Sequence, residues 1–211
     1  FALREPDGPD QRYGFMTLPD KLWLLTNAKS GSNSEAALEE LQSHCGTAGL
    51  SIERTIRFPD EDIPTAAELD LAGIGCLAIF TGDGTLNAAI TSLYGWSGAV
   101  LVLPGGTMNL LSIRMHGESE VGTIIARYKR GAMRRWRPLV ARCEAGDALA
   151  GLLIGPGTAW GSVREAMRDG DVAETTAKAS EAMTETTEGP QVHCLEPPLG
   201  RPEGYPLIEM T

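Results

Sequence analysis

Three glycine-containing loops are the part of this 211-residue sequence whose residue types could do chemistry. They read N-A-K-S-G at residues 27–31, T-G-D-G-T at 81–85 and P-G-G-T-M-N at 104–109. Glycine lets the backbone approach a ligand closely, and backbone amides at the start of a helix bind anions. An aspartate between two glycines, as at Asp83, is well placed to hold a metal ion or a sugar hydroxyl beside a polyphosphate. We interpret the loops as a cradle for a nucleoside triphosphate.

The common phosphate-binding fingerprints do not describe these loops. The sequence has no G-x-x-x-x-G-K-[ST] motif, which excludes a P-loop protein. The run Gly82-Asp83-Gly84 lacks the third glycine of the dinucleotide-binding fingerprint. Strand-to-helix turns often contain glycine without binding anything, but three such loops at one edge of a sheet favour a ligand site.

The elements around the loops predict an α/β fold. Apolar runs at 22–25, 76–80 and 99–103 directly precede the three loops and are typical of buried parallel strands, and a further strand is predicted at 51–58. Helical spacing of apolar residues alternates with these strands, which predicts a parallel sheet with its ligand site beyond the carboxyl ends of the strands. We expect helices to open at the capping-box spacing Ser32-x-x-Glu35, at 65–71, after residue 85 and at 121–128.

The loops resemble those of the diacylglycerol kinase catalytic-domain family, which includes sphingosine kinases and bacterial lipid kinases. The family loop N-P-x-S-G has Ala28 in place of proline here, and G-G-D-G-T has Thr81 in place of the first glycine. The family loop P-x-G-T-x-N is matched in full at 104–109, and Arg114 matches a downstream arginine. The resemblance covers residues 21–116, and Thr81 adds a β-branched side chain that could narrow its loop.

The resemblance implies an α/β nucleotide-binding domain of the phosphofructokinase and NAD kinase type, followed by a partial β-rich second domain. We expect an arm at 1–20, the nucleotide-binding domain at 21–133 and the second domain at 134–211. Strands at 139–143 and 149–154 and a helix after 155–161 start the second domain, and 175–187 forms a surface helix or a mobile segment. Because family members have a longer second domain, we expect a truncated or abbreviated one here.

The resemblance also implies an ATP-dependent lipid kinase that uses Mg²⁺ and phosphorylates a lipid hydroxyl on a diacylglycerol-like or sphingoid acceptor. It assigns the metal to Asp83 and indicates no catalytic base. The residues it assigns to the nucleotide are Asn27, Ser30, Gly31, Gly82, Asp83, Gly84, Thr85, Gly106, Thr107 and Asn109.

Two other functions remain open from the sequence. An NAD kinase-like enzyme would share the loop at 82–85, although it predicts an Asn-Glu pair after the next strand, and 104–109 contains none. A non-catalytic nucleotide-binding module is the other alternative, and an incomplete second domain would favour it.

Charge and composition limit the partners. With 18 basic and 28 acidic residues the formal net charge is −10, which argues against general nucleic-acid binding. A basic cluster with Trp136 inside it predicts peripheral contact with an anionic membrane, unless it is simply a solvated helix end. The cluster contains Arg127, Lys129, Arg130, Arg134, Arg135 and Arg137.

The sequence also gives an expectation for the cellular compartment of the protein. It has no signal-like segment, no apolar run long enough to span a membrane, and four scattered cysteines that we interpret as reduced thiols. We therefore expect a cytoplasmic protein, peripheral at the inner membrane face if the basic cluster binds lipid. A homodimer is left open.

Overall fold

The structure is a computed structural model that describes residues 18–30, 33–144, 146–195 and 197–210. The chain divides into two compact units, residues 1–150 and 151–211. Most of the arm predicted at 1–20 lies outside the described residues. The division at 133 and 134 that the sequence predicted stays a prediction.

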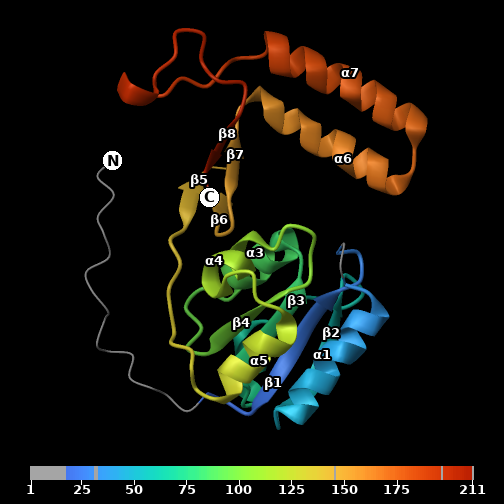
Figure 1. Cartoon of the computed structure of the whole chain (residues 1–211), viewed down its shortest axis with the longest axis vertical. Helices are drawn as coiled ribbons and strands as arrows, with labels where there is room; N and C mark the ends of the chain where they lie inside the picture. Colours follow the sequence, from blue (N-terminus) through green and yellow to red (C-terminus); the bar gives the residue numbers. More distant parts are fainter. Residues whose placement is uncertain (1–17, 31–32, 145, 196, 211) are drawn as a thin grey trace. The chain divides into compact units, whose positions relative to one another are not determined.

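A four-stranded parallel sheet forms the centre of the first unit (Figure 1). Its strands are β1 (Lys21–Asn27), β2 (Ser51–Phe58), β3 (Cys76–Thr81) and β4 (Ala99–Pro104), in the order β2-β1-β3-β4. Every residue of β3 is buried, as expected of an inner strand of a parallel sheet. The predicted α/β class is confirmed, and the three loops follow the carboxyl ends of β1, β3 and β4.

Helices cover both faces of this sheet, because successive side chains of a strand point to opposite faces. Ala78 and Phe80 of β3 pack in one core cluster, and Leu77 and Ile79 pack in the other. The first cluster includes residues of α1 (Glu35–Thr47) and α5 (Val121–Lys129). The second includes residues of α2 (Ala66–Leu71), α3 (Asp83–Ser92) and α4 (Leu110–His116).

Two helix starts differ from the sequence prediction. The capping box expected from Ser32 is wrong for α1: the helix begins at Glu35 and its N-cap is Ser34, whose hydroxyl accepts a hydrogen bond from the Ala37 amide. Ser32 itself lies outside the described residues. Helix α4 was not predicted, because its first residues are capped from another loop rather than by a local side chain. The helix predicted at 65–71 is α2, and a capping box between Thr65 and Glu68 opens it.

A short antiparallel hairpin ends the first unit. It pairs β5 (Ala141–Cys143) with β6 (Gly146–Ala148). The second strand of this pair therefore begins before the strand predicted at 149–154, part of which forms β7 (Leu152–Ile154) of the second unit. Gly146, the first residue of β6, has a φ of 134°, a conformation that glycine adopts readily.

The second unit combines a helix pair with a small antiparallel sheet. Strand β7 pairs with β8 (Ile208–Met210), and α6 (Trp160–Asp169) packs against α7 (Val172–Glu188). The stretch 175–187 is thus part of a helix, with Ala182 buried on it. Among the helices of the described ranges, none is long and apolar enough to cross a bilayer. Two 3-10 turns, η1 (Pro156–Ala159) and η2 (Pro197–Leu199), complete the unit.

Candidate functional site

The three predicted loops meet at the carboxyl end of the sheet. The backbone N–H of Gly82 in the second loop donates to Ser30 Oγ in the first at 3.0 Å. Asn27 Nδ2 donates to Thr85 Oγ1 at 2.9 Å, which joins the same two loops a second time. A Cβ added at Gly106 in the third loop would lie 2.5 Å from the Cα of Gly82. Loops predicted from separate stretches of sequence therefore meet at one edge of the sheet.

The glycines of the third loop are required by close packing. A Cβ at Gly105 would lie 2.6 Å from both the carbonyl carbon of Phe80 and the nitrogen of Thr81. A clash with backbone atoms cannot be relieved by turning a side chain, so both Gly105 and Gly106 act by letting two loops touch. Thr81 is buried, and its hydroxyl donates to the Gly82 carbonyl at 3.1 Å.

The start of α3 is the open part of the site. Its N-cap is Gly82, which has no side chain to bond the first amides of the helix. A Cβ at Gly84 would meet nothing within 4 Å, so space lies next to these amides. Unpaired N–H groups at a helix start carry partial positive charge and bind phosphate. This turn of backbone is where the three loops can receive an anion.

Asp83 links the second and third loops. Its Oδ2 accepts a hydrogen bond from the Leu110 amide at 3.1 Å, and its Oδ1 accepts one from the Leu111 amide at 3.2 Å. The carboxylate thus caps α4, a structural role that the sequence analysis did not predict. Each carboxylate oxygen keeps a second lone pair, so a cation can still bind to Asp83.

Asn109 holds the shape of the third loop. Its Oδ1 accepts from the Gly106 amide at 2.7 Å, and its Nδ2 donates to the Gly106 carbonyl at 2.8 Å. Its backbone is left-handed, with φ of 51°, a conformation that asparagine tolerates better than most residues. The amide group predicted to line the nucleotide pocket is therefore engaged within its own loop, while Thr107 at the tip of the loop is exposed.

The structure places the predicted residues differently. Those that lie in the three joined loops are Asn27, Ser30, Gly82, Asp83, Gly84, Thr85, Gly106 and Asn109, of which Asn27 and Gly106 are buried. Thr107 is exposed at the tip of the third loop. Gly31 lies outside the described residues. Arg114 contacts a different segment, since its Nη1 donates to the Leu149 carbonyl at 3.3 Å.

A buried pair beneath the loops was missed by the sequence analysis. Thr26 Oγ1 donates to Asn33 Oδ1 at 3.0 Å, and Asn33 Nδ2 donates to the Phe80 carbonyl at 2.6 Å. Both side chains are buried. They connect the end of β1 to the end of β3, which fixes the spacing of the first two loops. Asn33 follows a Gly-Ser stretch, where an asparagine ordinarily indicates only a turn.

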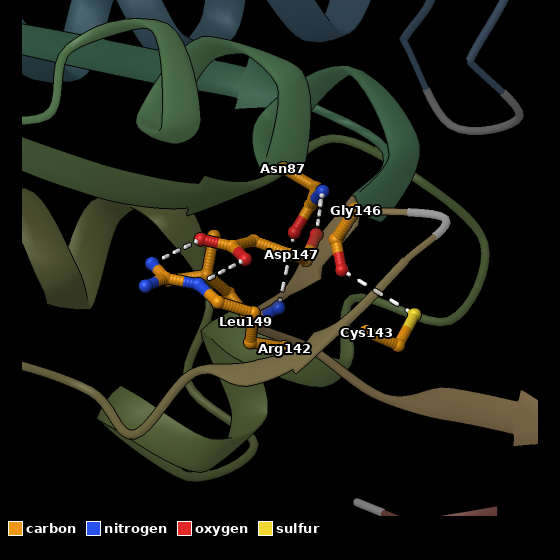
Figure 2. A network of polar contacts seen from close by, with 6 residues as sticks. All are labelled: Asn87, Arg142, Cys143, Gly146, Asp147 and Leu149. Carbon is orange, nitrogen blue, oxygen red and sulfur yellow. Dashed lines mark hydrogen bonds and ion pairs between the residues drawn. The ribbon is translucent and has the colours of Figure 1, made fainter.

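A second network connects the β5-β6 hairpin to α3 (Figure 2). Asn87 Nδ2 donates to the Asp147 carbonyl at 2.8 Å, and Asn87 Oδ1 accepts from the Leu149 amide at 3.0 Å. Arg142 binds the Asp147 carboxylate with two hydrogen bonds of 2.8 Å. The hydrogen bonds from Arg142 lower the pKa of Asp147. Asn87 lies one turn along α3 from Asp83. The hairpin is therefore attached to the same helix whose first turn would bind the anion.

The two buried cysteines of the first unit are poor nucleophiles. Burial raises the pKa of the Cys76 and Cys45 thiols to about 11, so both stay protonated at neutral pH. The described residues contain no group of three or more His, Cys, Asp or Glu side chains that could hold a metal ion. Backbone amides, hydroxyls and one carboxylate suit the positioning of a polyphosphate, which is most of what phosphoryl transfer asks of a protein.

Comparison with known proteins identifies the family of the chain. The family model for the diacylglycerol kinase catalytic domain matches residues 21–139, more than half of the chain. Two crystal structures from Bacillus anthracis strain Sterne, described as a candidate diacylglycerol kinase and as a diacylglycerol kinase, are 16% and 17% identical to the chain, each with a TM-score of 0.49. The matches cover 69% and 68% of this chain but 54% and 50% of theirs, so it spans about half their length. No curated protein matches the chain.

Proposed function

Because the chain belongs to the diacylglycerol kinase catalytic domain family, we propose that it transfers a phosphoryl group from ATP to the hydroxyl of a lipid. The observation that carries the proposal is the start of α3, which no side chain caps and where Gly84 leaves open space. The joined loops around it supply hydroxyl, amide and carboxylate groups.

The residues present fit a nucleotide with its metal ion. The amides at the start of α3 bind the phosphates, and Thr85 and Ser30 keep their loops in contact with that turn. Mg²⁺ in nucleotide sites takes one or two carboxylates and completes its shell with phosphate and water, so the single carboxylate of Asp83 is a sufficient protein ligand. When bound, the metal neutralises phosphate charge.

Exposed apolar side chains beside the loops support a lipid as acceptor. Met108 in the third loop is 56% exposed and Ile113 on α4 is 43% exposed. Ile113 belongs to the helix that Asp83 caps, and Met108 lies two residues before the start of that helix. An acyl or sphingoid chain can cover such side chains, whereas a sugar or a nicotinamide nucleotide has little apolar surface to contact them. We propose a diacylglycerol-like or sphingoid acceptor.

The variant Gly84→Ala tests the nucleotide site. Alanine fits the helix and meets no atom within 4 Å, so folding is preserved, but its methyl group enters the space that the phosphates need. We expect Mg²⁺-ATP affinity, measured by calorimetry, to fall about tenfold, which is a loss of about 1.4 kcal/mol. The matched control is Gly46→Ala in α1, also open within 4 Å and outside the three loops. Equal affinity in both variants would contradict the proposal.

Transfer of label from γ-labelled ATP decides between the functions. We expect label in diacylglycerol or sphingosine presented in mixed micelles. Label in NADP instead would favour an NAD kinase-like enzyme. Tight Mg²⁺-ATP binding with no labelled product would favour a non-catalytic nucleotide-binding module.

A further inference from the structure

The segment of residues 130–140 connects α5 to β5 without regular secondary structure (Figure 1). It is the basic part of an acidic chain: no Asp or Glu occurs from residue 121 to residue 143, although the net charge is −10. Its cations lie close together in sequence, and the structure shows which of them are available to a partner.

Three of the six cations in residues 127–137 form hydrogen bonds or ion pairs within the fold. Arg127 Nη1 donates to the His116 carbonyl at 3.3 Å. Lys129 Nζ pairs with Asp20 at 2.7 Å. Arg135 Nη1 donates to the Ser97 carbonyl at 3.2 Å and its side chain is half-buried. These three side chains keep α5 and the segment in place.

The other three cations face solvent. The side chains of Arg130, Arg134 and Arg137 are exposed and make no hydrogen bond or ion pair with any residue that the structure describes. Met133 packs against the core, and Arg135 is held at Ser97. The segment therefore presents the side chains of all three arginines to solvent.

Apolar side chains are exposed next to these arginines. Trp136 is 48% exposed, Leu139 is 70% exposed and Val140 is 36% exposed. Exposed cations alone would be ordinary for a solvated surface. A tryptophan and two aliphatic side chains beside free arginines are the composition of proteins that bind at a membrane interface, where the ring sits at the headgroups and the cations meet anionic lipid.

We propose that this surface, formed by Arg130, Arg134, Trp136, Arg137, Leu139 and Val140, docks the protein on an anionic lipid membrane. Each basic residue near such a membrane contributes attraction, and the apolar side chains add contact with the hydrocarbon boundary. A nucleic acid would use only the cations and would be repelled by a chain of net charge −10. The docking does not depend on the proposed kinase activity, and it can succeed or fail separately.

Binding of the full chain to vesicles tests the electrostatic part. We expect sedimentation with vesicles of phosphatidylglycerol and phosphatidylcholine and little with phosphatidylcholine alone. The variant Arg130→Gln/Arg134→Gln/Arg137→Gln should bind the anionic vesicles about 100-fold more weakly, at about fivefold per charge. Raising the salt from about 0.1 M to about 1 M shortens the screening length from about 10 Å to about 3 Å and should release the wild type.

A charge-matched control separates local from overall charge. Lys21→Gln/Arg164→Gln/Arg201→Gln removes the same charge from exposed cations elsewhere and should bind as the wild type does. Because the side chains of these three arginines form no hydrogen bond or ion pair within the described ranges, their variant should melt at the wild-type temperature. Equal vesicle binding by the two triple variants, or equal binding of the wild type to neutral vesicles, overturns the proposal.

Tryptophan fluorescence tests the apolar part without changing charge. Emission should shift to shorter wavelength on anionic vesicles, and Trp136→Phe should abolish the shift. Trp160→Phe is the control, because Trp160 is similarly exposed at 42% but donates its ring N–H to Thr186 in the second unit. A shift that survives in Trp136→Phe, or tighter binding to duplex RNA than to vesicles, would show that the surface does not dock on lipid.

Discussion

Gly106 approaches Gly82 so closely that a Cβ added to Gly106 would lie 2.5 Å from the Cα of Gly82. The loops after β3 and β4 therefore touch backbone to backbone. Asn109 bonds both the N–H and the carbonyl of Gly106 and keeps it at this position. The turn that would bind phosphate is thus shaped in part by a loop that follows another strand.

Replacing Gly106 with alanine should separate the two loops. Overpacking of this kind costs about 1–3 kcal/mol, and we expect that loss in the free energy of unfolding by urea. Nucleotide affinity should fall as well, because Gly82 is the N-cap of α3. The open position Gly46 supplies the control alanine variant, which should unfold at or above the wild-type midpoint. Identical midpoints for the two variants would show that the loops can move apart at no cost.

Substitutions of Asp83 should separate its two roles. Asp83→Ala removes the cap of α4 and should destabilise the protein by about 1 kcal/mol. Asp83→Asn keeps one acceptor oxygen and should lose less stability, but it removes the negative charge that a cation needs. Melting curves without nucleotide measure the first effect, and ATP titrations with and without Mg²⁺ measure the second. Full Mg²⁺ dependence in Asp83→Asn would rule out this carboxylate as a metal ligand.

Truncation of Asn87 should loosen the β5-β6 hairpin. Asn87→Ala leaves the Asp147 carbonyl and the Leu149 amide without their partner, which costs about 1–3 kcal/mol where these groups stay buried. Asn87→Asp should recover only the bond to Leu149, because a carboxylate cannot donate to a carbonyl. Hydrogen exchange should accelerate in residues 141–149 and stay unchanged in β1. Uniform acceleration across the first unit would instead indicate global destabilisation.

Stability should fall in mild acid because of His116. Burial lowers the pKa of its imidazole, whose Nε2 lies 3.1 Å from the Val102 carbonyl. The unfolded chain, with the ordinary histidine pKa of about 6.5, then binds more protons than the folded one. The free energy of unfolding should therefore decrease as the pH falls from about 7 through about 6.5 and below.

The control for this pH dependence is a histidine outside the first unit. His116→Gln should flatten the curve of urea midpoint against pH over this range, whereas His193→Gln, at an exposed position, should leave its slope unchanged. A wild-type slope in His116→Gln would assign the acid sensitivity to other groups.

Local patterns were enough to predict the sheet and the places of the loops. The fully buried β3 is an uninterrupted apolar run, and α5 carries its buried Ile124, Ile125 and Tyr128 at helical spacing. Such signals depend on neighbours within a few residues, so they can be read along the chain. The family resemblance added the chemistry of the loops and agrees with the match over residues 21–139.

The contacts that complete the site depend on the tertiary structure. Asp83 bonds Leu110 at a separation of 27 residues, Asn33 bonds Phe80 at 47 and Ser30 bonds Gly82 at 52. No periodicity relates such positions, because the separation is set by whole strands and helices between them. The same holds for the basic cluster, in which only the fold decides that Lys129 is paired and Arg137 is free. Residue types along the chain specified which groups could bind phosphate or lipid, and packing between distant segments decided which of them are left to do so.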